Sequence, residues 1–260
     1  MIIDRQNFVL KEEIREYWTR RAETFDQSPF HGMRAPGEKE AWMKLIGSHV
    51  DRQEGADVLE LAFGTGEITA VLLALGYRVT GLDLVESMLA RAKAKHATAK
   101  SLSLYLGDAE DTREPHASHD AIVMRHLVWT LVDQAAAFSD WFRVVRPGGR
   151  IVVIDGNFVE KSLIKRLRRR LSTFLERLQG TSAHYIDWAA HNSILSRVYF
   201  NTGLTPEHLR KMLQNAGFED FRIDNLEPVR SVQRRKARLS DRLKLGLSES
   251  FILSCRKPNA

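Results

Sequence analysis

The chain has 260 residues with 43% hydrophobic content, and its 39 basic and 33 acidic side chains give a formal net charge of +6. This length and composition suffice for one sizeable core with a small cap. The single cysteine excludes an internal disulfide, no apolar run is long enough to span a membrane, and no cleavable signal sequence is visible. We therefore expect a cytoplasmic protein.

The N-terminal arm carries an amphipathic aromatic pattern, with Tyr17-Trp18, Arg21-Ala22 and Phe25-Asp26 at helical spacing. This pattern predicts a helix packed on the core. His31 follows in a loop rich in proline and glycine, and it is a candidate active-site residue. A lone histidine, however, is more often structural or merely exposed.

The most informative stretch is 58–67, VLELAFGTGE, in which an apolar strand runs into a turn with Gly64 and Gly66. A helix follows, and a second strand ends near Asp83. Such a turn lets main-chain N–H groups and a helix N-terminus approach a bound molecule closely. Because an acid at the end of the second strand can accept hydrogen bonds from a ribose diol, the sequence predicts an adenosine-containing cofactor.

The spacing of the glycines distinguishes between two such cofactors. The dinucleotide fingerprint G-x-G-x-x-G requires a third glycine, and Thr69 stands at that position. Glu67 would also share the helix N-terminus with a pyrophosphate anion. A cofactor with a cationic sulfonium and an amino-acid tail suits this acidic turn better than a nicotinamide dinucleotide.

The rest of the chain alternates between strand and helix patterns, which predicts a parallel α/β sheet with right-handed crossovers. In chain order the expected elements are a strand at 57–62, a helix at 68–75, a strand at 78–84, a helix at 86–99, strands at 102–106 and 119–125, a helix capped by Asp133 and ended by Pro147, a strand at 151–155, a helix capped by Thr205 and ended by Gly217, and strands at 218–226 and 249–256.

Four motifs occur in a characteristic order, namely Glu60-x-Ala62-x-Gly64-x-Gly66, then DLVESML at 83–89, GDAE at 107–110 and RPGGR at 146–150. Together they resemble class I S-adenosylmethionine-dependent methyltransferases, in the type 11 branch related to ubiquinone-biosynthesis enzymes. That family usually has glycine where this chain has Ala62, so the backbone there is slightly less permissive.

The resemblance implies a Rossmann-like α/β fold, with a seven-stranded mostly parallel sheet, an antiparallel C-terminal hairpin and helices on both faces. It divides the chain into an N-terminal helical lid at 1–50 and a cofactor-binding core at 51–157. An inserted helical cap at 158–204 would cover the substrate, and residues 205–260 would supply the last helix and strands.

The resemblance also implies cofactor-binding roles. Asp83 would accept from the ribose hydroxyls, Glu60 would orient the turn or accept from the amino group, and Asp108 with Ala109 would lie beside the adenine. Leu84 and Met88 would sandwich the adenine or belong to the plain core. The full set of implied cofactor residues is Tyr17, Glu60, Ala62, Gly64, Gly66, Asp83, Leu84, Met88, Asp108, Ala109, Met124 and Arg125.

The segment 125–131, RHLVWTL, resembles one that borders the methyl-transfer site in a subgroup of these enzymes. His126 is a candidate general base because imidazole titrates near neutral pH, and it is equally consistent with a loop-shaping role. Asp155 and His31 are further candidates. Transfer to a nitrogen, oxygen, carbon or sulfur atom by in-line displacement depends mainly on positioning, so no metal is required, and no metal-ligand spacing is present.

The predicted cap contains a basic amphipathic helix at 163–178, followed by the aromatic and histidine residues His184, Tyr185, Trp188, His191, Tyr199 and Phe200. The charge run, like a second one at 230–244, is a solvated face or attracts an anionic substrate, nucleic acid or acidic lipid. We expect a methyltransferase for a small molecule, with S-adenosylmethionine as cofactor. Two other functions remain open, an RNA methyltransferase and a non-catalytic cofactor-binding protein. The oligomeric state, monomer or homodimer, also remains open.

Overall fold

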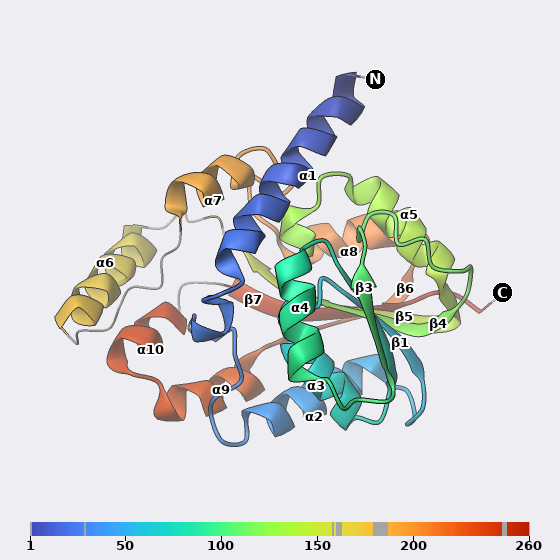
Figure 1. Cartoon of the computed structure of the whole chain (residues 1–260), viewed down its shortest axis with the longest axis horizontal. Helices are drawn as coiled ribbons and strands as arrows, with labels where there is room; N and C mark the ends of the chain where they lie inside the picture. The colour runs from blue at the N-terminus through green and yellow to red at the C-terminus, as the bar shows by residue number, and fades with distance from the viewer. Residues whose placement is uncertain are drawn as a thin grey trace.

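The computed structural model describes residues 2–28, 30–157, 159, 163–178, 187–245 and 249–259. Within them a seven-stranded sheet has the order β3-β2-β1-β4-β5-β7-β6 (Figure 1). The strands are β1 (Asp57–Leu61), β2 (Arg78–Asp83), β3 (Leu102–Leu106), β4 (His119–Arg125), β5 (Val145–Asn157), β6 (Glu219–Asn225) and β7 (Glu249–Arg256). Strands β1 to β5 pair in parallel, and β7 runs antiparallel to both β5 and β6. This arrangement confirms the predicted fold class.

Helices cover the sheet on both faces. They are α1 (Ile2–Arg21), α2 (Glu38–Val50), α3 (Glu67–Ala74), α4 (Glu86–Lys95), α5 (Gln134–Val144), α6 (Leu163–Leu178), α7 (Trp188–Leu195), α8 (Pro206–Asn215), α9 (Glu227–Lys236) and α10 (Leu239–Leu245), with the short 3-10 turns η1 (Phe25–Gln27) and η2 (Val128–Thr130). One apolar layer joins the sheet to α5 and α8, and a second joins it to α2, α3 and α9. Neighbouring strand residues such as Val58 and Leu59 enter opposite layers, as expected for strands buried on both faces.

Local sequence signals account for several element boundaries. Strands β3 and β4 have the predicted limits, and the side chains of Asp133 and Thr205 accept the capping bonds that begin α5 and α8. The fifth strand is longer than predicted. It begins at Val145 because that residue pairs with His119, and the register then shifts before Ala121. Helix α5 accordingly ends at Val144, before the predicted Pro-Gly-Gly stop.

Helix α4 is shorter than predicted and ends at Lys95. The next side chain, His96, turns instead toward the glycine-bearing turn, where its Nε2 lies 2.8 Å from the Gly66 oxygen. The last two strands do form an antiparallel pair, but α9 and α10 lie between them in the chain. The basic stretch at 230–244 is therefore largely helical, which its composition alone did not indicate.

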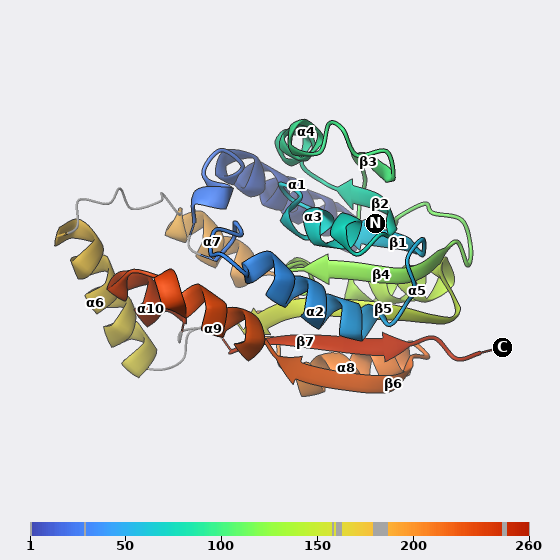
Figure 2. The same ribbon diagram turned by 90° about the horizontal axis from the view of Figure 1, so that it is seen from below.

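The segments outside the minimal sheet gather at one end of it. Helix α1 packs on α7 through Leu10, Ile14 and Tyr17, which contact Ile194 and Val198. In both views α6 lies beside α10, beyond the end toward which the parallel strands point (Figures 1 and 2). His184 and Tyr185 lie outside the described residues. The predicted limits of the lid and cap stay a prediction.

The C-terminal segment fixes the end of α5. The Lys257 ammonium donates to the carbonyl oxygens of Phe142 and Val145 at 2.7 and 3.0 Å, and it lies 4.6 Å from the centre of the Phe142 ring. Carbonyls at a helix C-terminus have no partner within the helix, and a cation there also complements the helix dipole. Desolvation lowers the pKa of Lys257.

We expect Lys257→Met to lower the free energy of unfolding by about 2 kcal/mol, because two carbonyls lose their donor while the apolar stem is kept. Arg256→Met is the matched control. Its guanidinium lies 3.7 Å from both Glu219 and Asp220 on the surface, so we expect a loss below about 1 kcal/mol. Urea unfolding of both variants measures the difference. Equal losses would contradict the anchoring role of Lys257.

Candidate active site

A pocket lies at the carboxyl ends of β1, β2 and β4, beneath α1. With its open mouth and the solvent space in it included, the pocket comprises about 840 Å³. Its lining comes from the glycine-bearing turn, the ends of β2 and β4, the loop after β3 and the inner side of α1. The lining residues are Lys11, Ile14, Trp18, Phe25, Ala62, Gly64, Leu82, Asp83, Leu84, Val85, Met88, Gly107, Asp108, Ala109, Glu110, Arg125, His126, Leu127, Thr130, Leu131 and Val132.

Asp83 is fixed at the centre of this pocket by main-chain donors. One carboxylate oxygen accepts from the Gly64 N–H at 2.8 Å, and the other accepts from the Val85 N–H at 2.9 Å. Burial raises the pKa of Asp83 to about 6, and the bonds from Gly64 and Val85 oppose that rise. The carboxylate has lone pairs beyond these two bonds, so it can accept further hydrogen bonds from a diol.

The turn itself needs left-handed backbone. Gly66 has φ +85°, and a Cβ there would lie 2.7 Å from the His96 ring nitrogen. Ala62, which stands where the resembling family usually has glycine, also adopts a positive φ of 53°. A non-glycine residue held in this region is strained, and such strain persists only where the surroundings fix it. The left-handed backbone of Ala62 is therefore imposed by the surrounding structure and not by the conformational preference of alanine.

The loop after β3 brings Asp108 and Ala109 to the pocket, and Lys11 of α1 reaches across to them. The Lys11 ammonium lies 2.6 Å from carboxylate oxygens of both Asp108 and Glu110. Desolvation would lower the pKa of Lys11, but its bonds to Asp108 and Glu110 outweigh that effect and raise it. Lys11 thus links α1 to the acid predicted to lie beside the adenine, a contact that sequence reasoning missed.

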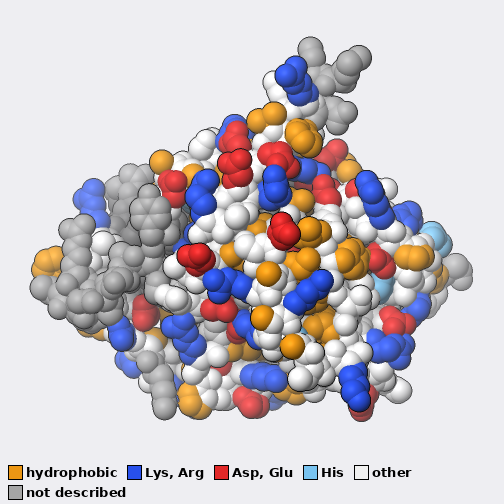
Figure 3. Space-filling model, viewed as in Figure 1, with side chains coloured by type: hydrophobic (Ala, Val, Ile, Leu, Met, Phe, Trp, Pro, Cys, Tyr) orange, Lys and Arg blue, Asp and Glu red, His pale blue; other side chains and the backbone are white. Residues whose placement is uncertain are grey.

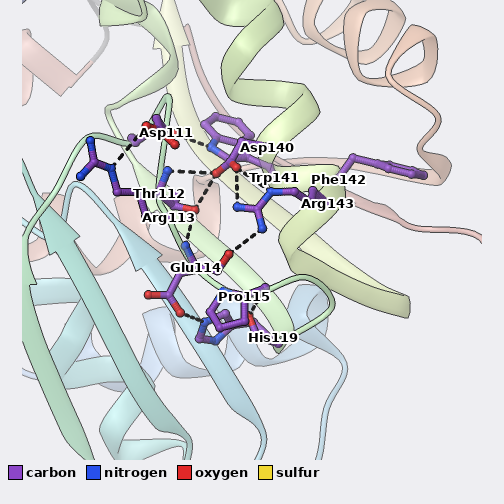
Figure 4. Close-up of polar contacts among 12 residues, drawn as sticks. Asp111, Thr112, Arg113, Glu114, Pro115, His119, Asp140, Trp141, Phe142 and Arg143 are labelled. Atoms are coloured by element: carbon purple, nitrogen blue, oxygen red, sulfur yellow. Dashed lines mark hydrogen bonds and ion pairs between the residues drawn. The ribbon is translucent and has the colours of Figure 1, made fainter.

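A network behind the pocket holds this loop against α5 (Figure 4). The Trp141 indole N–H donates to the Ala109 carbonyl at 2.8 Å. Asp140 accepts from the Thr112 hydroxyl at 2.6 Å and pairs with Arg143, which also donates to the Glu114 carbonyl at 2.6 Å. These contacts explain why a loop can place the main chain of Ala109 accurately.

Aromatic and histidine rings line up on the side of the pocket away from this loop. Phe25 lies 5.8 Å from Trp18 and 4.6 Å from His31, and His31 lies 5.8 Å from His126, measured between ring centres. Trp18 also lies 6.4 Å from Trp129. These rings come from α1, the loop after it and the segment after β4, so they form a largely apolar wall with two imidazoles.

His126 has an unusual backbone and a perturbed titration. Its φ is +59°, and its N–H donates to the Ile154 carbonyl at 2.8 Å. Burial lowers the pKa of His126 well below its ordinary value, and the nearby Arg125 and His31 act in the same direction. The lowered pKa keeps His126 neutral near pH 7, and it also makes this imidazole a weaker base than an exposed histidine.

Asp155 lies behind the wall and does not line the pocket. Its carboxylate accepts from the Gly156 N–H at 2.8 Å and the Trp129 N–H at 3.4 Å, and burial raises its pKa to about 7. Through Trp129 it orders the segment that follows His126. The geometry therefore gives Asp155 a supporting position rather than direct contact with a ligand.

Glu60 also lies behind the pocket. Its carboxylate accepts from the Thr69 hydroxyl at 2.6 Å, which joins β1 to α3 beneath the glycine-bearing turn. Burial raises the pKa of Glu60 to about 8, and the Thr69 bond and the charge of Arg125 oppose the rise. Arg125 is partly buried, and it donates to the His31 carbonyl at 2.9 Å.

The structure brings most of the predicted site residues together. The predicted residues that line the pocket are Ala62, Gly64, Asp83, Leu84, Met88, Asp108, Ala109, Arg125 and His126. Those outside its lining are Tyr17, His31, Glu60, Gly66, Met124 and Asp155. Tyr17 points instead toward α7, where its hydroxyl lies 3.5 Å from His191 Nδ1. Within the described residues no cluster of side chains suits a metal ion.

Comparisons with known proteins agree with this geometry. Residues 59–153 match the family model described as a methyltransferase domain. These residues include the glycine-bearing turn, Asp83, Asp108 and His126. Over these residues the chain is thus similar to methyltransferase domains. The resemblance inferred from the four motifs is thereby confirmed.

Demethylmenaquinone methyltransferase of Staphylococcus aureus is 26% identical over 193 residues, which cover 72% of this chain and 77% of that protein. The methyltransferase domain also shares its fold with phosphoethanolamine N-methyltransferase 2 of Haemonchus contortus in complex with S-adenosyl-L-methionine, with a TM-score of 0.57 and 16% identity over 85% of this chain. The match spans only 53% of that longer protein. The [4+2]-cyclase SpnF has a TM-score of 0.56 and 17% identity, covering 84% of this chain and 81% of that one.

The buried acid beneath the turn should make stability depend on pH. Folding raises the pKa of Glu60 from 4.5 to about 8. The contribution of the protonated Glu60 to the free energy of unfolding is therefore complete below pH 4.5 and is lost as the pH rises toward 8. We expect Glu60→Gln to keep the hydrogen bond to Thr69. The unfolding free energy of this variant should fall less steeply with rising pH than that of wild type, by about 1 kcal/mol per pH unit near neutrality. Urea unfolding across that range measures this. Glu54→Gln, at an exposed carboxylate, should leave the slope unchanged. If the unfolding free energy of Glu60→Gln depended on pH as steeply as that of wild type, the raised pKa of Glu60 would be refuted.

Proposed function

We propose that this chain transfers the methyl group of S-adenosylmethionine to a nitrogen or oxygen atom of a small-molecule acceptor. The observation that carries the proposal is the Asp83 carboxylate, held by the Gly64 and Val85 N–H groups inside the pocket of a methyltransferase domain. That acid has free acceptor capacity at the place where a ribose diol would donate.

Residues of the pocket and the adjoining turn can be matched to the ribose, the methionine tail and the adenine of this cofactor. Asp83 would accept from the ribose hydroxyls, and the positive-φ turn at Gly64 and Gly66 allows close approach of the methionine tail. Asp108 and the main chain of Ala109 would meet the adenine edge. Glu67 of this turn accepts from the Met33 N–H and pairs with Lys95, and it does not line the pocket, so we assign it no contact with the cofactor.

Calorimetric titration tests the cofactor site. We expect micromolar binding of S-adenosylmethionine and S-adenosylhomocysteine, and Asp83→Ala should weaken both at least about tenfold because two hydroxyl contacts are lost. As burial raises the pKa of Asp83 to about 6, wild-type affinity should decline as the pH falls through 6, whereas Asp83→Ala should lack this decline.

Asp57→Ala is the matched control, because Asp57 lies at the opposite end of β1 and pairs with Arg78. Its variant should bind the cofactor like wild type. No heat with either methionine cofactor, together with clear heat from a nicotinamide dinucleotide, would overturn the proposal.

The acceptor would lie against Trp18, Phe25 and His126, which line the pocket. When bound, S-adenosylmethionine supplies a methyl group already activated on a sulfonium. The chain has to align the acceptor atom with that methyl, exclude water and remove a proton where the acceptor carries one. His126 lines the pocket and is neutral near pH 7, so its imidazole is placed to take that proton.

Asp155 and His31 support this arrangement from behind and beside it. Asp155 holds the segment after His126 through the Trp129 N–H, and His31 faces the His126 ring at 5.8 Å. Positioning of the acceptor supplies most of the acceleration, and proton removal adds to it. Because a [4+2]-cyclase shares this fold, turnover has to be measured rather than inferred from binding.

Release of S-adenosylhomocysteine over a panel of phenols, amines and carboxylic acids tests the catalytic assignment. We expect His126→Asn to lower kcat about 100-fold with cofactor affinity unchanged, because asparagine tolerates the positive φ but cannot act as the base. His208→Asn, at an exposed histidine of α8, is the control and should keep the wild-type rate.

Two results would count against this assignment. Unchanged kcat in His126→Asn would remove His126 from the reaction. Tight cofactor binding by wild type without release of product from any acceptor would favour a non-catalytic cofactor-binding protein.

A further inference from the structure

Helix α6 turns its apolar side toward solvent. Leu167, Leu171 and Phe174 recur at a spacing of three to four residues, and they are 68%, 47% and 58% exposed. Ser172, on the other side of the helix, is fully buried, and its hydroxyl donates to the Ser240 carbonyl of α10 at 2.9 Å. A surface helix of a globular protein normally buries its apolar stripe, so this orientation indicates that the stripe contacts something outside the chain.

The same region concentrates the positive charge of the protein. By sequence, α6 has six basic and one acidic side chains, and residues 227–245 have seven basic and two acidic ones. Each segment thus carries a net charge of +5, so the rest of the chain carries −4 of the total of +6. On the face that carries α1 and α4, by contrast, acidic and basic side chains are interspersed (Figure 3).

Basic and apolar side chains are both accessible in α6 and α10. Arg168 and Arg170 are exposed beside the apolar stripe of α6, and in α10 Leu239 is exposed next to Arg238. The two helices lie side by side in both views (Figures 1 and 2). Apolar side chains bordered by arginines are typical of helices that lie in the interface of a membrane.

We propose that α6, together with α10, binds the surface of an anionic lipid bilayer, with Leu167, Leu171 and Phe174 inserted among the lipids. Among the described residues no helix has the length and apolar character needed to cross a bilayer, so contact would be limited to the interface. The arginines would meet acidic headgroups, each adding about 1 kcal/mol of attraction near the surface.

Charge distinguishes this occupant from two others. A second copy of the chain seated on the stripe would bring two strongly positive surfaces together, which is unfavourable. A nucleic acid would satisfy the arginines but would leave the exposed leucines and Phe174 without an apolar partner. An acidic bilayer satisfies both kinds of side chain at once.

Vesicle flotation with the full chain tests the proposal. The probes are vesicles of phosphatidylcholine alone and vesicles with about one third phosphatidylglycerol. We expect the partition coefficient to be at least about tenfold higher on the anionic vesicles and to fall with added salt. Leu167→Ser/Phe174→Ser should lose about tenfold of that binding, and Arg168→Gln/Arg170→Gln should lose a similar amount.

The substituted side chains are exposed, so the variants should fold, and far-ultraviolet circular dichroism with cofactor titration verifies this. Ile223→Ser, at an exposed apolar residue of β6, is the matched control and should bind vesicles like wild type. Sedimentation velocity is run in parallel. The proposal is overturned by absence of vesicle binding, by binding that Leu167→Ser/Phe174→Ser leaves unchanged, or by a wild-type dimer that this variant converts to monomer without any vesicle binding.

Discussion

The hydrogen bond between the Gly64 N–H and the Asp83 carboxylate is the contact on which the pocket depends. It ties the turn after β1 to the end of β2, two strands already held in register by the pairing of Leu61 with Leu82. The carboxylate is desolvated to make this bond, which is why its pKa rises to about 6. Burial of the Asp83 carboxylate destabilises the folded chain. Hydrogen bonds from a diol to the same oxygens would offset part of this destabilisation when a ligand binds.

Around this contact the protein arranges two kinds of support. Behind the pocket, Glu60 and Asp155 are buried acids that fix the glycine-bearing turn and the segment after β4, and the pKa values of both are raised by burial. In front, Lys11 of α1 pairs with Asp108 and Glu110. An adenine amine arriving at Asp108 would have to share that carboxylate with Lys11. Under the proposed cofactor site, binding of the adenine and the position of α1 would therefore be coupled through the Lys11 ammonium.

Sequence reasoning succeeded where a feature is set by near neighbours. The caps at Asp133 and Thr205 and the glycine-bearing turn are local, and they were predicted correctly. It failed where a feature needs a distant partner. Lys11 contacts a residue 97 positions away, and the early start of β5 depends on pairing with His119. Tertiary packing also decides that Asp83 lines the pocket and Glu60 does not, because both acids lie at or next to the carboxyl end of an apolar strand.

Membership of a fold family predicts the two sides of the pocket to different degrees. The cofactor side is built from strand ends and the turns after them, which any member of the fold supplies. The proposed acceptor side is built from α1, the segment after it and the segment after β4, where Phe25, His31 and His126 contact one another through their rings. A shared fold therefore extends to a cyclase as readily as to methyltransferases. Helices α6 and α10 lie beyond the same end of the sheet (Figure 2). A bilayer bound by α6 and α10 would therefore lie beyond the end of the sheet that also carries the pocket.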